Sequence, residues 1–443
     1  MPYGVHAPMD SVQPARPDAP RDPGPRQTRL QKLPRRHDTV LARSDARNPQ
    51  VCCVGFVSDT DIKTPRGRVS PLSGRLGSRP VIDEPINIAD FERVAAEKLE
   101  AGVLGYFAGG ACDEVTLRDN VESWQRWRLR PRMLVDVSAV ETSAQVLGAE
   151  VSMPILVAPV AYQRLADSEG EVGMARAAAA AGTVMCLSTL ATARPSEVAA
   201  EAPAGRRWFQ LYCFNDKAVT RALMDEAIES GFEAIVVTVD APPGGRRERD
   251  LRTGFKIPEG LGVPSVQAAL GVDREVTIEE TFSLMDPALS WSDIEDLASD
   301  CSVPVLVKGV LTAEDAVLAV EHAAAGIVVS NHGGRQLDCV LASADALPEV
   351  VDAVEGRAAV LVDGGVRHGT DVAIALALGA DAVLVGRPAL WGLAAAGEEG
   401  ARRVLELLRD ELELALALCG CTSPAGLSRA HVQRAPGASV YSV

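Results

Sequence analysis

Short apolar runs alternate with longer amphipathic stretches along the chain between residues 154 and 386. Each short run is nearly continuous in apolar residues, which is typical of a strand that is buried on both faces. Such strands occur in parallel sheets that helices cover on both sides. The runs that we interpret as strands are 154–159, 184–188, 208–212, 234–240, 304–308, 326–331, 359–363 and 381–386.

The stretches between these runs predict helices that connect parallel strands. Most runs are followed by a helical pattern, and the clearest examples are 170–181, 217–230, 313–322 and 370–378. Eight strand–helix units in succession favour closure of the sheet on itself. We therefore expect an α/β protein built on a (β/α)8 TIM barrel.

Three segments do not follow this repeat. Residues 88–106 predict a helix that begins near Asp90, within an N-terminal helical segment ahead of the barrel, and residues 399–419 predict a terminal helix outside it. Residues 254–290 are an insertion after the fourth strand. Barrel active sites form at that end of the strands, and long insertions in compact domains are commonly functional, so we expect a lid.

Residues 1–80 differ in composition from the rest of the chain. They are rich in Pro, Arg, Asp, Ser and Gly and show no sustained periodicity, which predicts a disordered extension ahead of a barrel domain at 81–443. The extension carries roughly twice as many Lys and Arg as Asp and Glu. A basic docking arm, a passive tail and a start codon placed too far upstream all remain open, and we assign the extension no catalytic role.

The composition is that of a globular protein, and its charge argues against a nucleic-acid partner. Of the 443 residues, 47% are hydrophobic, and the formal net charge is −16. Because the acidic body repels polyphosphate, we expect no nucleic-acid partner. An anionic substrate must instead be bound by locally placed Arg.

Cysteine usage and hydropathy bear on the compartment. The nine cysteines are an odd number and include no C-x-x-C pair, which favours reduced thiols. No apolar run reaches the roughly 18 residues that a membrane span needs, and the N-terminus lacks the layout of a signal peptide. We expect a cytoplasmic protein without a membrane partner.

Polar residues follow nearly every predicted strand. Because the carboxyl ends of barrel strands meet at one mouth, these side chains should converge there. A cap or a loop position would explain any one of them, but it explains the whole set poorly. The residues are Ser188, Gln210, Tyr212, Thr238, Asp240, Lys308, Ser330, His332, Asp363, Gly386 and Arg387.

The last two strands end in glycine and arginine. Asp363-Gly364-Gly365-Val366-Arg367 follows strand seven and Gly386-Arg387 follows strand eight. Barrels commonly bind phosphate at these two loops, through exposed amides, a helix N-terminus and Arg. A ligand with one phosphate group fits this position.

Two further strand ends predict acid–base chemistry on a carboxylate. Lys308 ends an apolar strand, so its ammonium needs either a barrel carboxylate or an electron-rich ligand as partner. His332 and Arg335 are three residues apart, so a proton acceptor and a carboxylate-binding fork can reach one ligand. Arg246 and Arg247 offer a second fork across the mouth.

From about residue 86 to about residue 420, the chain resembles the FMN-dependent 2-hydroxy acid oxidase and dehydrogenase family, which includes glycolate oxidase, lactate oxidase and mandelate dehydrogenase. The resemblance rests on six motifs in order: APVAYQRLADSEGE (158–171), WFQLY (208–212), TVDAPPGGRRERD (238–250), VKGVLTAEDA (307–316), SNHGGRQLD (330–338) and VDGGVRHGTD (362–371). The AYQRL stretch is similar to 4-hydroxymandelate oxidases.

The resemblance implies a role for each matching residue. His332 would be the base, Asp240 the carboxylate that stabilises its protonated form, and Lys308 the cation that stabilises reduced FMN. Arg247 and Arg335 would bind the substrate carboxylate, with Tyr106 and Tyr212 beside the substrate. The implied cofactor is FMN, with no metal ion, and its ligands would be Pro159, Val160, Ala161, Ser188, Gln210, Thr238, Lys308, Ser330, Asp363, Gly364, Gly365, Arg367, Gly386 and Arg387.

Three positions bear on acceptor and substrate. Ala161 stands where the family's oxidases tend to carry alanine and its dehydrogenases glycine, which favours O2 as the oxidant. Leu190 and Gly244 replace larger residues of glycolate oxidase and related members, so we expect a roomier pocket for an aryl or bulky, mandelate-like (S)-2-hydroxy acid. The products would be a 2-oxo acid and hydrogen peroxide.

Two other functions remain open at this point. The first is a dehydrogenase that passes electrons to a quinone or a protein carrier. The second is an FMN-barrel isomerase or a flavin-binding barrel without oxidase activity, although two Arg and a His suit a carboxylate better than a diphosphate. The family resemblance also implies a homo-oligomer, with a tetramer favoured.

Overall fold

A closed barrel of eight parallel strands lies at the centre of residues 84–436, the part of the chain that this computed structural model describes. The strands follow sequence order around the barrel, and the last pairs with the first, which confirms the expected (β/α)8 TIM barrel. The extension predicted for residues 1–80 lies outside the described residues. The barrel strands are β4 (Ile155–Val157), β5 (Val184–Ser188), β6 (Arg206–Leu211), β7 (Ile235–Thr238), β8 (Val305–Val310), β9 (Gly326–Val329), β10 (Ala359–Asp363) and β11 (Ala382–Val385).

Alternate residues of each barrel strand pack into the barrel interior, as the two-residue period of a strand requires. The residues between them, such as Ile155 and Val157, belong to a second core cluster that the surrounding helices share. The interior cluster includes one residue from each strand: Leu156, Cys186, Trp208, Val236, Leu306, Val328, Leu361 and Leu384.

A hairpin extends the interior cluster at the N-terminal end of the strands. It consists of β2 (Ala144–Val146) and β3 (Ala149–Val151), which pair antiparallel. The hairpin contributes Val146 and Val151 to the interior cluster. The opposite end of the barrel is the one that carries the polar strand ends.

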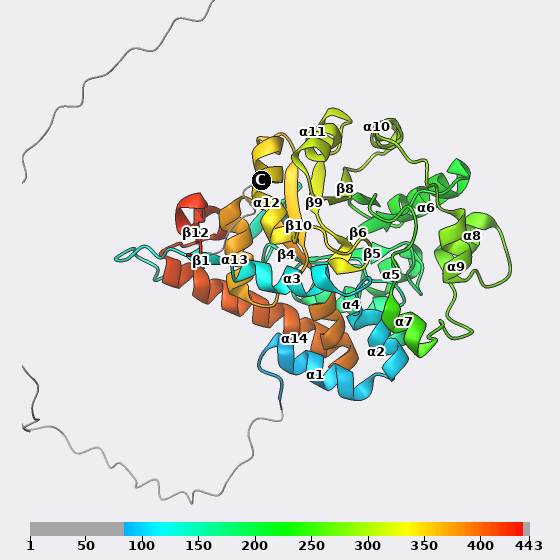
Figure 1. Cartoon of the computed structure of the whole chain (residues 1–443), viewed down its shortest axis with the longest axis horizontal. Helices are drawn as coiled ribbons and strands as arrows, with labels where there is room; N and C mark the ends of the chain where they lie inside the picture. The colour runs from blue at the N-terminus through cyan, green and yellow to red at the C-terminus, as the bar shows by residue number, and fades with distance from the viewer. Residues whose placement is uncertain (1–83, 437–443) are drawn as a thin grey trace, which may run out of the picture. The chain divides into compact units, whose positions relative to one another are not determined.

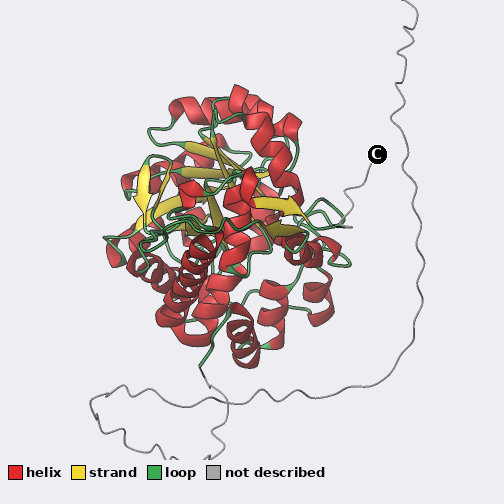
Figure 2. Cartoon of the chain, turned by 90° about the vertical axis from the view of Figure 1, so that its left-hand side faces the viewer, coloured by secondary structure: helices red, strands yellow, loops and turns green. Residues whose placement is uncertain are grey.

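A helix follows each barrel strand, and Figure 2 shows the helices around the central strands. Helix starts agree with local capping, because the side chains of Asp216 and Thr312 accept backbone N–H bonds at the starts of α6 and α11. The last helix begins directly after β11 and bends at Ala396 and Gly397, so it is longer than the predicted 399–419. The helices are α4 (Gly170–Ala180), α5 (Pro195–Glu201), α6 (Lys217–Glu229), α10 (Trp291–Asp300), α11 (Ala313–Glu321), α12 (Ser343–Val354), α13 (Gly369–Leu378) and α14 (Arg387–Cys419).

The helix predicted over 88–106 is wrong as a single element. The structure has α1 (Ile88–Lys98), which Asn87 caps, and a separate α2 (Ala101–Ala108), with extended backbone at Leu99. The two helices have different partners: α1 packs on α14 (Figure 1), whereas α2 packs on α7 (Glu248–Thr253). A β-carbon at Gly102 of α2 would lie 2.8 Å from the Phe255 ring, so the close approach of α2 to the segment after α7 favours a glycine there.

The remaining elements complete the ends of the barrel. The insertion folds as two short helices, α8 (Pro264–Leu270) and α9 (Ile278–Leu284), and a β-bridge between Phe214 and Met285 ties it back to the end of β6. Within residues 84–436, no helix is both long and apolar enough to cross a membrane. The other elements are α3 (Val115–Trp124), β1 (Trp127–Leu129), which pairs antiparallel with β12 (Val432–Arg434), and the 3-10 helices η1 (Gln163–Leu165), η2 (His332–Gly334), η3 (Pro424–Gly426) and η4 (Arg429–His431).

Candidate active site

A cavity opens at the carboxyl ends of the barrel strands, where the sequence predicts the site. It is lined by all of the predicted site residues except Asp240 and Ser330, which lie behind the wall and contact His332. Arg246, which the sequence offered together with Arg247 as the second fork, is exposed and does not line the cavity. The predicted residues in the lining are Tyr106, Pro159, Val160, Ala161, Ser188, Gln210, Tyr212, Thr238, Arg247, Lys308, His332, Arg335, Asp363, Gly364, Gly365, Arg367, Gly386 and Arg387.

The polar strand ends continue the rows of residues that fill the barrel. In each strand, the residue two positions after the interior residue named above lies at the level of the mouth, because side chains two apart share a face, and all of these residues except Ser330 line the cavity. Lys308, for example, follows Leu306, and Asp363 follows Leu361. The full set at this level is Ala158, Ser188, Gln210, Thr238, Lys308, Ser330, Asp363 and Gly386.

His332 and Asp240 form a hydrogen-bonded pair at the edge of the cavity. His332 Nδ1 lies 2.8 Å from Asp240 Oδ1, and the His332 backbone N–H donates to Ser330 Oγ at 3.0 Å. Burial opposes ionisation of Asp240, but the charge and hydrogen bond of His332 outweigh it and lower the pKa of the carboxyl. An ionised Asp240 accepts the Nδ1 proton, so Nε2 is the imidazole nitrogen left to accept a proton.

Two arginines and a tyrosine gather in another part of the cavity lining. The Arg335 guanidinium lies 5.1 Å and that of Arg247 6.0 Å from the centre of the Tyr106 ring. Arg335 donates to the Tyr106 carbonyl at 2.6 Å, whereas Arg247 contacts Asp250 at 3.2 Å. Burial, with the nearby charge of Arg247, lowers the pKa of Arg335 to about 10. A buried guanidinium that is held beside another cation is a favourable site for a carboxylate.

Lys308 has protein partners as well as access to the cavity. Its Nζ lies 3.2 Å from Asp363 Oδ2 and 3.0 Å from Ser330 Oγ. Burial alone would lower the pKa of Lys308, but Asp363 and Asp240 more than offset this effect and raise it. The ammonium therefore stays charged, and the barrel carboxylate that the sequence left open is one of its partners.

The phosphate end of the cavity combines tight turns with buried arginine. Gly364 and Gly365 adopt left-handed backbone, with φ of 99° and 78°, which admits glycine readily and other residues with strain. Burial, with Arg335 and Arg367 nearby, lowers the pKa of Arg387 to about 9, and burial also lowers that of Arg367. Within residues 84–436, Arg387 donates to three carbonyl oxygens, those of Phe107, Gly109 and Gly333, and forms no ion pair with a carboxylate.

The sequence missed several lining residues. Ile278 and Phe282 of α9 reach the cavity, and the Phe282 ring lies 6.3 Å from that of Tyr212. Gly244, which the sequence singled out for the substrate pocket, is exposed and does not line the cavity, although a β-carbon there would lie 4.0 Å from the Phe282 ring. The insertion has no barrel periodicity, so only its place after the fourth strand pointed to the cavity.

Unpaired polar atoms in the cavity fit the cofactor that the resemblance implies. Among residues 84–436, buried atoms without a hydrogen-bond partner include Gln210 Nε2, Thr238 Oγ1 and Asp363 Oδ1. Such atoms are costly unless a ligand satisfies them. A ring with polar edges near Gln210 and Thr238, a polyol near Asp363 and a phosphate at Arg367 and Arg387 would satisfy all of these groups, as FMN does.

Comparisons with known proteins agree with this fit. A model of the family described as FMN-dependent dehydrogenase matches residues 95–434. Glycolate oxidase 3 of Arabidopsis thaliana is 50% identical over 355 residues, which are 79% of this chain and 96% of that enzyme. An L-lactate oxidase of Nostoc sp. is 47% identical over 350 residues, which are 77% of this chain and 96% of that enzyme. The crystal structure of mandelate oxidase with (S)-4-hydroxymandelic acid superposes with a TM-score of 0.74 at 42% identity, over 79% of this chain and 99% of that one.

Proposed function

The chain belongs to the FMN-dependent dehydrogenase family, as an enzyme of 2-hydroxy acid oxidation that uses FMN, and we propose that its substrate is an aryl or similarly bulky (S)-2-hydroxy acid and its oxidant O2. The products are then the 2-oxo acid and hydrogen peroxide. The observation that carries the proposal is that His332, which Asp240 holds from behind the wall, lines one cavity together with Arg247 and Arg335.

We assign substrate binding to Arg335 and Arg247. Two guanidinium groups near the Tyr106 ring can hold a carboxylate through paired N–H donors, which a lysine cannot reproduce. Burial raises the pKa of Tyr106 and Tyr212, so both phenols are donors at neutral pH. They are suited to hydrogen bonds with the oxygens of a bound hydroxy acid.

We assign proton removal to His332. Asp240 fixes the Nδ1 proton, so Nε2 accepts one proton from the substrate and the carboxylate stabilises the resulting imidazolium. The substrate loses two electrons and two protons in all. FMN, when bound, accepts the two electrons.

We assign the cofactor to the rest of the cavity. Lys308 would face one edge of the ring and stabilise negative charge there. Asp363 would accept from the ribityl hydroxyls, and Arg367, Arg387 and the amides at Gly365 and Gly386 would hold the phosphate. The ring would contact Pro159, Val160, Ala161, Ser188, Gln210 and Thr238, whereas Ser330, which lies behind the wall, would act through its hydrogen bond with Lys308.

The walls beside the substrate support an aryl side chain. Leu190 and Phe282 line the cavity, and Gly244, which lies outside the lining, places no side chain against the Phe282 ring. An aromatic ring placed there would pack on Phe282 and Tyr212. The mandelate oxidase structure with (S)-4-hydroxymandelic acid offers a precedent for such a ligand in this fold.

Two observations support O2 as the oxidant. Ala161 lines the cavity at the position where alanine accompanies the family's oxidases. The glycolate, lactate and mandelate enzymes named above are all oxidases. Two electrons and two protons convert O2 into hydrogen peroxide, which balances the reaction.

The test is anaerobic absorbance of the purified yellow protein during titration with (S)-mandelate, 4-hydroxymandelate, lactate and glycolate, followed by air. We expect bleaching at the lowest concentrations with the aryl acids, rapid return of colour in air, and one equivalent of peroxide. Tighter response to lactate or glycolate would overturn the aryl assignment.

The same experiment separates the alternatives. Bleaching without recovery in air would indicate a dehydrogenase with another electron acceptor. Absence of bleaching with every acid would contradict the substrate class. His332→Ala should retain FMN and lose reduction by orders of magnitude, and near-normal reduction in that variant would remove His332 from the role of base.

We also propose that the chain forms a homo-oligomer. Met133, Leu134 and Val135 are consecutive, and 69%, 105% and 44% of their surfaces are exposed. Consecutive exposed apolar residues favour burial against a second copy. Leu134→Glu should lower the mass measured by light scattering, while Arg128→Glu, an exposed polar control in β1, should not.

A further inference from the structure

Asn120 of α3 joins directly to the residue that precedes His332. Its Nδ2 donates to Asn331 Oδ1 at 2.8 Å, and Asn331 Nδ2 donates to Asn120 Oδ1 at 2.8 Å. The two residues are only 2% and 4% exposed. Because a buried amide without partners is costly, the reciprocal pair fixes each side chain in one orientation.

The fixed amide of Asn331 closes the turn that carries His332. Its Oδ1 also accepts the Gly334 backbone N–H at 3.0 Å, and its Nδ2 also donates to the Leu341 carbonyl at 3.1 Å. His332 and Gly333, inside this turn, have φ of 58° and 63°. A left-handed histidine persists only where its surroundings constrain the backbone, and the Asn331 side chain provides that constraint.

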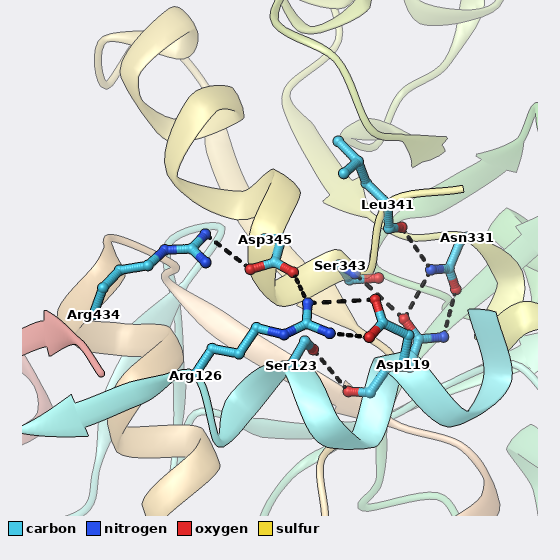
Figure 3. Close-up of polar contacts among 9 residues, drawn as sticks. Asp119, Ser123, Arg126, Asn331, Leu341, Ser343, Asp345 and Arg434 are labelled. Carbon is cyan, nitrogen blue, oxygen red and sulfur yellow. Dashed lines mark hydrogen bonds and ion pairs between the residues drawn. The ribbon is translucent and has the colours of Figure 1, made fainter. Parts of the chain in front are cut away.

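Helix α3 is itself anchored. Figure 3 shows Arg126, just after the helix, between Asp119 and Asp345 of α12, and Asp345 also accepts from Arg434 of β12 at 2.9 Å. These contacts join α3 to α12 and β12. They hold the helix in place without contacting Asn331 or His332.

The same helix packs on the loop at the phosphate end of the cavity. Trp124 Nε1 donates to the Gly364 carbonyl at 3.0 Å. A β-carbon on Gly365 would lie 1.8 Å from the Asn120 carbonyl oxygen, so backbone meets backbone there. Asn120 therefore contacts the loop at Gly364 and Gly365 through its main chain, and it contacts the turn that carries His332 through its side chain.

We propose that Asn120 is a positioning residue for His332. Asn120 does not line the cavity, so it acts through Asn331, whose orientation sets the backbone that aims the imidazole. The inference rests on the proposed role of His332 as the base. Asn120 lies outside the barrel, on helix α3, and the same helix packs on the loop at Gly364 and Gly365 that would hold the phosphate of FMN.

The test measures the rate of anaerobic flavin reduction, the substrate affinity, the FMN dissociation constant and the thermal midpoint of Asn120→Ala and Asn120→Asp. Misplacement of a base by about 1 Å can slow reaction about 100-fold, so we expect reduction about 10- to 100-fold slower. Substrate affinity and FMN affinity should stay within a few-fold of the wild type. Wild-type reduction rates in both variants would overturn the proposal, whatever their thermal midpoints.

Asn120→Asp adds a pH readout that loss of packing does not give. A protonated carboxyl has one donor and one acceptor toward Asn331, as the amide does, whereas an ionised carboxylate cannot donate. The rate of Asn120→Asp relative to the wild type should therefore rise as pH falls. A ratio that stays constant with pH would overturn the proposal.

Two control variants separate the possible failures. Asp119→Asn removes a partner of Arg126 one residue away and should lower the thermal midpoint while the reduction rate stays unchanged. Equal slowing in Asp119→Asn would mean that helix docking in general is responsible, which overturns the role of Asn120. If His332→Ala reduces normally, the proposed function fails and this inference with it. If only His332→Ala is slow, this inference alone fails.

Discussion

The ammonium of Lys308 lies 3.2 Å from a carboxylate oxygen of Asp363, and the two side chains are 4% and 10% exposed. They are the last inward-facing residues of β8 and β10, so the pair bridges the mouth of the barrel over β9. The second oxygen of Asp363 has no partner among residues 84–436. Asp363 thus neutralises the charge of Lys308 with one carboxylate oxygen and leaves the other oxygen available to accept a hydrogen bond from a ligand.

Lys308→Met should strongly destabilise the apoprotein. Removing one partner of a buried pair leaves the other charge uncompensated, and the free energy of unfolding should fall by about 3–5 kcal/mol. Urea denaturation measures the change. The double variant Lys308→Met/Asp363→Asn is the control and should recover part of the loss, because it no longer buries a lone carboxylate. Equal stability of the single and double variants would argue against the pair.

Arg335→Lys should weaken substrate binding more than it slows flavin reduction at saturation. The ammonium cannot make the paired contacts of a guanidinium, and a hydrogen bond to a charged group contributes about 1.5–3 kcal/mol, so KM should rise about 10- to 100-fold. Stopped-flow reduction over a range of substrate concentrations separates the two quantities. An unchanged KM, with the thermal midpoint preserved, would remove Arg335 from the carboxylate site.

Inorganic phosphate should stabilise the FMN-free protein. Burial depresses the pKa of Arg387 and Arg367, so an anion bound beside them relieves unfavourable burial of charge. At ten times its dissociation constant, phosphate should add about 1.4 kcal/mol. Differential scanning fluorimetry in phosphate, against chloride at matched ionic strength, measures the shift. Arg387→Gln should reduce the shift, and a shift of wild-type size in that variant would contradict the assignment.

Gly244→Leu should narrow the substrate range. The new side chain would lie against the Phe282 ring, so kcat/KM for mandelate should fall about 10-fold or more relative to lactate. Leu190→Met conserves volume and is the control, with a ratio near that of the wild type. If Gly244→Leu left the ratio unchanged, the aryl group would have to bind elsewhere.

Asp240 should contribute stability that is lost in acid. The folded-state pKa of Asp240 is lowered, so its contribution is present above the unfolded value of about 3.9 and disappears as pH falls through the folded value. The unfolding free energy of the wild type should therefore exceed that of Asp240→Asn at pH 5, and the difference should shrink toward pH 3. Urea denaturation at each pH measures it. A difference that grows in acid would reverse the sign of the argument.

The barrel and its polar mouth could be predicted because both follow from local pattern. Lys308 and Asp363 stand at the ends of apolar runs, and an inward-facing row continues along a strand at every second residue. The same logic explains why Ser330 and Asp240 were found although they lie behind the cavity wall.

The rest depended on contacts between distant segments. The break after Lys98 reflects the separate partners of α1 and α2, which the continuous pattern over 88–106 does not reveal. Phe282 lies in an insertion without barrel periodicity, so its contact with the cavity depends on how α9 folds back. Asn120 lies outside the barrel, 211 residues from Asn331, and only the folded chain brings the two amides together.

In each barrel strand, the interior residue and the residue at the mouth lie on the same face. A change that displaces the mouth residue therefore also disturbs the core. Insertion or deletion of one residue within a barrel strand would turn Lys308 or Asp363 toward the surrounding helices. The neighbouring residues, which normally face outward, would then lie at the mouth. The error would bury a charge among apolar helices, so the damaged chain would fail to fold and would be open to degradation. Chains with such a one-residue shift would then be degraded before they accumulate, because the same strand register places both the core residues and the residues of the site.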